Sequence, residues 1–279
     1  MTTATDNSIE RQGRRIAYTA YGPASGTPVL FIAGAGCGRR MAFGLEQLDA
    51  RGVRLISIDR PGIGASDPDP DKTFDSVAAD FAAAIDAVAG HPVPVVANSQ
   101  GAPFGLALAA TGCVSHLVLV SPIDDLGHPA VGALLPDAHR AFVAAVAADP
   151  DGAMRDLARY TPTALFDMMM ADYPDCDRAV YDDPGFRAML RTALSDGFAR
   201  GPAGYARDTL LATCPWPLHL MAPGVGVQVM FGSDDAVHSP DLGATLTDRI
   251  PGAARTVVAD VGGSLLWAQP STVLSALGC

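Results

Sequence analysis

Residues 93–110, VPVVANSQGAPFGLALAA, constrain the fold more strongly than any other stretch of the chain. The β-branched apolar run at 93–97 predicts a buried strand, and the Ala- and Leu-rich run from residue 102 predicts a helix. Between them, the small residues Ala97 and Gly101 flank Ser99 at a distance of two positions on either side. Such a tight turn leaves the serine hydroxyl above the sheet, as in a nucleophile elbow. A serine that only caps the following helix is the alternative.

Similar apolar runs alternate with helical patterns along most of the chain. Strands are predicted at 14–20, 29–33, 54–58, 93–97, 116–121, 227–231 and 255–259, and helices at 74–89 and 271–277. Runs of this kind indicate parallel strands joined by crossover helices, so the predicted class is α/β with a mostly parallel, doubly wound sheet. After Pro122 the pattern becomes helical. We therefore predict a core of residues 1–122 and 207–279 and a helical lid insertion at 123–206.

Composition restricts the partners. The formal net charge of -11 argues against nucleic acid and anionic membranes, because phosphate binding needs a basic face. Hydrophobic residues make up 49% of the chain, yet no apolar run approaches the roughly 20 residues that span a bilayer. The first residues lack the apolar centre of a secretory signal, and the five cysteines show neither disulfide nor zinc spacing. We expect a cytoplasmic monomer or homodimer without metal or cofactor, acting on a small molecule or peptide.

Six segments of the chain carry a resemblance to a known family: LFIAGAG, SIDRPGIGASDPDP, ANSQGAPFG, LVLVSP, FGSDDAVHSP and GGSLLWAQP. In order and spacing they resemble the α/β-hydrolase superfamily along almost the whole chain. The likeness is to its lidded members, which are related to haloalkane dehalogenases, epoxide hydrolases and proline iminopeptidases. The resemblance implies the α/β-hydrolase fold.

The same resemblance implies roles by position. Ser99 is the nucleophile, and the backbone N–H groups of Ala35 and Gln100 form the oxyanion hole. Gly34, in the glycine-rich loop at 33–38, lets the backbone approach a ligand closely. Asp235, three residues after the glycine that ends a strand, is the triad acid. The alternatives for the acid are Asp234, Asp124 and Asp125.

The triad base is missing from its usual position. The family places a histidine third in a GGH sequence after the last strand, and that position here is Ser264. A serine cannot replace an imidazole as a base at neutral pH. No histidine follows His238 in the sequence. The candidate surrogate bases are His238, three residues after Asp235 on the same loop, and His128, at the start of the lid. If position 264 is an empty histidine site, replacing Ser264 by histidine is predicted to raise ester hydrolysis.

The lid supplies candidate substrate contacts, because thioether and aromatic side chains suit an adaptable apolar pocket. These candidates are Met168, Met169, Met170, Phe166, Tyr160, Tyr173 and Tyr181, with Trp267 from the core. Packing within the lid is the alternative role for the lid residues. The lid acids are predicted to form a solvated face; they are Asp167, Asp172, Asp175 and Asp177.

Three functions fit these patterns. The first is non-hydrolytic chemistry such as epimerisation, isomerisation, lyase or cyclisation steps on a natural-product or peptide substrate, by analogy with triad-broken enzymes such as the peptide epimerases of bottromycin-type biosynthesis. The second is an esterase, thioesterase or peptidase with a surrogate base. The third is a ligand-binding pseudoenzyme.

Overall fold

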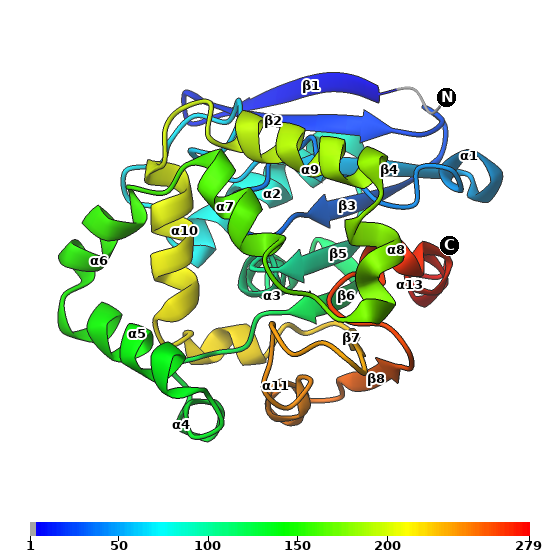
Figure 1. The fold of residues 1–279 in the computed structure, drawn as a ribbon. Helices are drawn as coiled ribbons and strands as arrows, with labels where there is room; N and C mark the ends of the chain where they lie inside the picture. The colour runs from blue at the N-terminus through cyan, green and yellow to red at the C-terminus, as the bar shows by residue number, and fades with distance from the viewer. Residues whose placement is uncertain (1–3) are drawn as a thin grey trace.

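Within residues 4–279, eight strands form one sheet in the order β1-β2-β4-β3-β5-β6-β7-β8 (Figure 1). A computed structural model describes residues 4–279. β1 pairs antiparallel with β2 and β2 pairs antiparallel with β4, whereas all remaining neighbours are parallel. The strands are β1 (Ala4–Arg11), β2 (Arg14–Tyr21), β3 (Thr27–Ile32), β4 (Val53–Ile58), β5 (Val93–Ser99), β6 (Val114–Pro122), β7 (Val227–Gly232) and β8 (Ala254–Val258). The predicted mostly parallel α/β sheet is confirmed.

Helices cover both faces of this sheet. Those of the core are α1 (Leu48–Arg51), α2 (Phe74–Val88), α3 (Ala102–Ala109), α11 (Ala244–Arg249), α12 (Leu265–Ala268) and α13 (Pro270–Ala276), with the 3₁₀ helix η2 (Leu218–Met221). Between β6 and β7 lie α4 (Pro129–Gly132), α5 (Asp137–Ala148), α6 (Pro150–Leu157), α7 (Pro162–Met169), η1 (Asp175–Asp177), α8 (Arg178–Tyr181), α9 (Pro184–Gly197) and α10 (Ala203–Thr213). The predicted lid boundary at residue 206 falls within α10, and the bounds 123–206 remain a prediction. Below, the lid denotes the helical segment between β6 and β7.

Alternating residues of the buried strands enter two separate cores. In β3, Leu30 and Ile32 pack with α2 and α3 on one face, whereas Val29 and Phe31 pack with α13 and the lid on the other. Strands buried on both faces need continuous apolar runs, which is why the sequence reads VLFI here. At the carboxyl edge of the sheet, the loop after β3 meets the end of β5 at Ser99, and the loops after β7 and β8 meet at His238 and Gly263.

The strand β1 was not predicted from the sequence. Its residues ATDNSIER are mostly exposed, and the strand pairs only with β2 at the antiparallel edge. An edge strand of this kind carries no apolar run that a pattern search detects. Among the helices at 4–279, none is both long and apolar enough to cross a bilayer.

Candidate active site

Ser99 ends β5 in a strained turn. Its φ of 51° lies in the left-handed region, which L-residues rarely adopt. The loop after β3 comes close to it, since a Cβ at Gly34 would lie 3.2 Å from Ser99 Cβ. Helix α3 also lies close to the strand: a Cβ at Gly105 would lie 2.8 Å from Ala97 Cβ. Gly105 therefore provides the space that Ala97, in place of the family's usual glycine, takes up.

The loop at residues 33–38, called the oxyanion loop after its predicted donor Ala35, is held in place by Arg60. The guanidinium of this buried arginine donates to the carbonyls of Ala33 at 2.6 Å and Gly34 at 2.9 Å, and its Nε donates to Asp208 at 2.7 Å. In a trans peptide, the N–H of Ala35 points opposite to the Gly34 carbonyl, and hence away from Arg60.

The two predicted oxyanion donors are free to bind a ligand. Within residues 4–279, neither the Ala35 amide nor the Gln100 amide donates a hydrogen bond to a protein acceptor. Gln100 is held by its side chain instead, because its Nε2 donates to Thr209 Oγ1 at 3.0 Å. The arrangement provides two backbone donors beside Ser99, which is the requirement for stabilising an oxyanion.

Asp235 and His238 form a hydrogen-bonded pair on the loop after β7. His238 Nδ1 lies 2.9 Å from Oδ1 and 3.0 Å from Oδ2 of Asp235. Because an ionised carboxylate only accepts, Nδ1 carries the proton and Nε2 is left as the basic nitrogen. Burial alone would raise the pKa of the Asp235 carboxyl, but the charge and hydrogen bond of His238 and the Val237 amide outweigh it and lower that pKa. The carboxylate thus stays ionised and orients the imidazole.

The His238 ring packs against the loop that carries the family's histidine. A Cβ at Gly263 would lie 3.0 Å from Cε1 and 3.3 Å from Nδ1 of His238, and 3.5 Å from the Tyr181 hydroxyl. The imidazole therefore occupies the space directly beside residues 262–264. Among the described residues, no hydrogen bond links Ser99 Oγ to His238. In unliganded enzymes such contacts are often long and tighten with substrate.

Ser264 faces the lid and is fully buried. Its hydroxyl donates to Asp177 Oδ1 at 2.6 Å, and its amide donates to Oδ2 at 3.2 Å. The Gly262 amide donates to Asp177 Oδ1 at 2.8 Å. Asp177, which ends η1, is thus buried and accepts three hydrogen bonds from the loop at 262–264. The prediction that Asp177 belongs to a solvated face was wrong, because these donors compensate for its burial.

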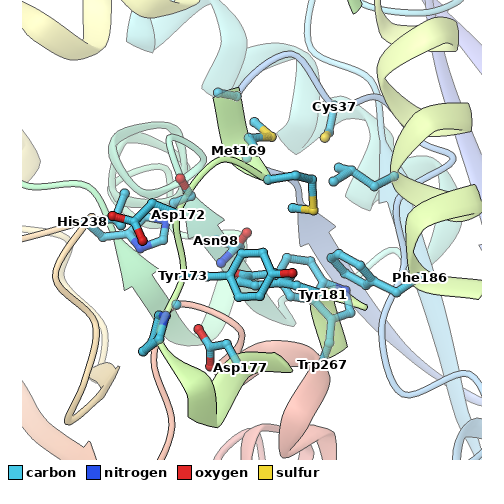
Figure 2. Close-up of a pocket in the computed structure, with 18 of the residues that line it drawn as sticks. Cys37, Asn98, Met169, Asp172, Tyr173, Asp177, Tyr181, Phe186, His238 and Trp267 are labelled. Carbon is cyan, nitrogen blue, oxygen red and sulfur yellow. The ribbon is translucent and has the colours of Figure 1, made fainter. Parts of the chain in front are cut away.

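The candidate residues meet in a cavity of about 400 Å³ (Figure 2). Ser99, Ala35 and His238 line it together. The rest of its lining is largely apolar and aromatic, and includes Met41, Met169, Met170, Tyr173, Tyr181, Phe186, Leu190 and Trp267. Burial raises the pKa of the Cys37 thiol to about 12, so this thiol stays protonated at neutral pH. Burial and the negative charges of Asp177 and Asp235 also raise the pKa of Tyr181, which keeps its phenol a hydrogen-bond donor.

Some of the predicted site residues line the cavity, and others lie outside its lining. Gly34, Ala35, Ser99, Met169, His238 and Trp267 line the cavity, and Asp235 lies behind His238. The other predicted residues are not part of its lining: Gln100, His128, Tyr160, Phe166, Met168 and Ser264. Met168 is 53% exposed, and Phe166 is buried under Arg191, whose guanidinium carbon lies 4.0 Å from the ring centroid.

The alternative acids are engaged elsewhere, apart from one at the mouth of the cavity. Asp124 accepts from Ser239 at 2.9 Å, and Asp125 pairs with Arg249 at 2.8 Å. Asp234 lines the cavity but is exposed. Of the acids considered, Asp235 is the one that the structure pairs with an imidazole.

Within residues 4–279, this geometry defines a class of protein: an α/β domain with a serine at a strand-to-helix elbow, two backbone amides next to it that have no protein acceptor, and a cavity-lining histidine paired with an acid. Residues 27–270 match the sequence profile of the family described as alpha/beta hydrolase fold. The chain belongs to this family. A search of curated protein sequences found no relative of this chain.

Solved structures agree on the fold. The enol-lactonase from Burkholderia xenovorans LB400 superposes with a TM-score of 0.73 at 19% identity, covering 98% of this chain and 100% of that one. Rv0554 from Mycobacterium tuberculosis gives a TM-score of 0.65 at 26% identity, covering 94% and 92%. The esterase RhEst1 from Rhodococcus sp. ECU1013 gives 0.66 at 20% identity, covering 99% and 97%.

Proposed function

We propose that this protein is a serine hydrolase of carboxylic esters, with Ser99 as nucleophile and His238 as a relocated base. The observation that carries the proposal is the Asp235–His238 pair, which directs an imidazole into the cavity that contains Ser99. A serine hydroxyl needs an adjacent base to become an effective nucleophile, and that base needs a partner that fixes its tautomer. Asp235 supplies the partner.

The reaction follows from these positions. His238 Nε2 accepts the Ser99 proton as Oγ bonds to the substrate carbonyl carbon, and the amides of Ala35 and Gln100 stabilise the resulting oxyanion. Nε2–H then protonates the leaving alcohol as the carbon–oxygen bond breaks. Water repeats the two steps on the acyl-enzyme and releases the acid. Ser264 takes no part in the proton transfer.

The test combines covalent labelling with turnover. A fluorophosphonate probe should label the wild type at Ser99, and p-nitrophenyl acetate hydrolysis should fall by about 10³-fold or more in both Ser99→Ala and His238→Ala. His139→Ala, on the exposed lid helix α5, is the matched control and should retain full activity. Loss of activity in His128→Ala but not in His238→Ala would assign the base to the other candidate histidine.

A second candidate is non-hydrolytic proton transfer, such as epimerisation or isomerisation next to a carbonyl group. It is favoured by the lack of a hydrogen bond between Ser99 and His238 among the described residues. Here His238 would remove a proton from carbon while the Ala35 and Gln100 amides stabilise the enolate. The Ser99→Ala variant distinguishes the two candidate functions. Proton exchange into a bound carbonyl compound would survive in this variant, whereas ester hydrolysis would not. Binding without turnover in either assay would support the pseudoenzyme.

A further inference from the structure

A second pocket adjoins the main cavity behind an aromatic wall. It has a volume of about 270 Å³ and shares Phe186 and Trp267 with the main cavity. Its other lining comes from the loop at 42–46, from Ala179, Val180, Asp183 and Met189 of the lid, and from Pro270. The segment that leaves the oxyanion loop thus continues directly into the lining of the second pocket.

The wall is formed by two rings in edge contact. The ring centroids of Phe186 and Trp267 are 5.2 Å apart, with an interplanar angle of 69°. Trp267 is fixed, because its Nε1 donates to the Ala42 carbonyl at 3.0 Å. The Phe186 ring has no polar anchor and is held by packing, with Tyr181 on its other side at 5.5 Å between centroids. Phe186 is therefore the part of the wall that is held by packing alone.

The chemistry proposed above determines on which side of the cavity the acyl chain of the substrate lies. The leaving alcohol must lie beside His238, which protonates it, so the acyl chain extends to the opposite side of Ser99. Figure 2 shows His238 on one side of the cavity and Phe186 with Trp267 on the other. The acyl chain consequently points at the wall.

We propose that the second pocket is a subsite for the far end of a linear, neutral acyl chain, and that Phe186 sets the chain length. This inference rests on the proposed ester hydrolysis. Phe43, Leu45, Val180 and Met189 supply apolar contacts, whereas Glu46 and Asp183 lie exposed at the outer part of the pocket. No basic side chain lines the pocket within the described residues. A chain that ends in a carboxylate is therefore disfavoured, and an aliphatic end is accepted.

Acyl-chain selectivity tests the wall. The ratio of kcat/KM for p-nitrophenyl decanoate to that for the acetate should rise on the order of tenfold in Phe186→Ala and fall in Phe186→Trp, since each buried methylene is worth about fourfold. Phe142→Ala, on the exposed face of α5, is the control and should leave the ratio unchanged. If both Phe186 variants hydrolyse esters with the wild-type ratio, the subsite is refuted while the proposed function stands.

Binding gives a readout that does not depend on turnover. In a Trp216→Phe background, Trp267 is the remaining tryptophan of the two in the chain, so its fluorescence reports on the wall. Decanamide should change this fluorescence, with tighter binding in Phe186→Ala and weaker binding in Phe186→Trp. Equal affinities in all three proteins would overturn the subsite. If the wild type hydrolyses no ester but these affinities shift as expected, the proposed function fails and the pocket remains.

Discussion

His238 and Asp235 lie three residues apart on one loop, with Nδ1 of the imidazole 2.9 and 3.0 Å from the two carboxylate oxygens. Both partners therefore come from the same short segment after β7, and the loop after β8 contributes packing against the imidazole at Gly263. This explains how the chain can carry an oriented imidazole although position 264 holds a serine.

Ser264→His should not raise ester hydrolysis. The sequence alone predicts a gain, because the variant restores the family's usual residue. In the structure, however, Ser264 is fully buried and bonded to Asp177. An imidazole there must displace both the Asp177 carboxylate and its own neighbours, at a cost of about 1–3 kcal/mol. Chemical denaturation should show reduced stability, with Ser264→Ala as the milder control. A more active and equally stable Ser264→His would contradict this view of the site.

Asp235→Asn should change the acid dependence of stability. The folded-state pKa of Asp235 is lowered from 3.8, so its stabilising contribution is fully present above that value and is lost as the pH falls through the folded pKa. The free energy of unfolding of the wild type should therefore fall more steeply than that of the variant between about pH 5 and pH 3.

Asp124→Asn provides the matched comparison for that titration. Burial raises the pKa of Asp124, so this carboxyl favours the folded state more as the pH falls. Removing it should steepen the loss of stability toward acid, opposite in sign to Asp235→Asn. Parallel urea titrations of the three proteins across this range would reveal the difference, and identical slopes would exclude the assigned pKa directions.

Gly263→Ala should reduce kcat more than it raises KM. The added Cβ would lie 3.0 Å from Cε1 of His238 and would push the imidazole from its place in the cavity that contains Ser99. Misplacing a base by about 1 Å typically costs on the order of 10²-fold. Gly132→Ala in α4 is the control, since the nearest atom to its new Cβ is 3.7 Å away. Wild-type kcat in Gly263→Ala would argue against His238 as the base.

Gly105→Ala should destabilise the elbow by about 1–3 kcal/mol, because its Cβ would lie 2.8 Å from that of Ala97. The second substitution Ala97→Gly removes the opposing Cβ and should recover most of the loss. A double-mutant cycle by urea denaturation measures this coupling. Additive effects of the two substitutions would show that the strand and helix adjust independently here.

The sequence predicted the sheet well because its central strands are buried on both faces and must be apolar throughout, as in VLFI of β3. The elbow was predictable for a similar reason, since its small residues are required locally. β1 carries no such constraint. No local sequence pattern indicates that Asp177 is buried, because its three hydrogen-bond donors belong to residues 85 and 87 positions away along the chain. Placing Met168 outside the cavity and Met169 inside it likewise depended on how the lid packs.

The contact between Asp177 and the loop at 262–264 also limits how this protein can be recombined with its relatives. A lid taken from a homologue that lacks this aspartate would leave two buried amides and one buried hydroxyl without an acceptor, each costing about 1–3 kcal/mol. Conversely, this lid on a core with the usual histidine would place a carboxylate against the imidazole. A chimera that keeps this core therefore needs an acceptor at position 177 of its lid.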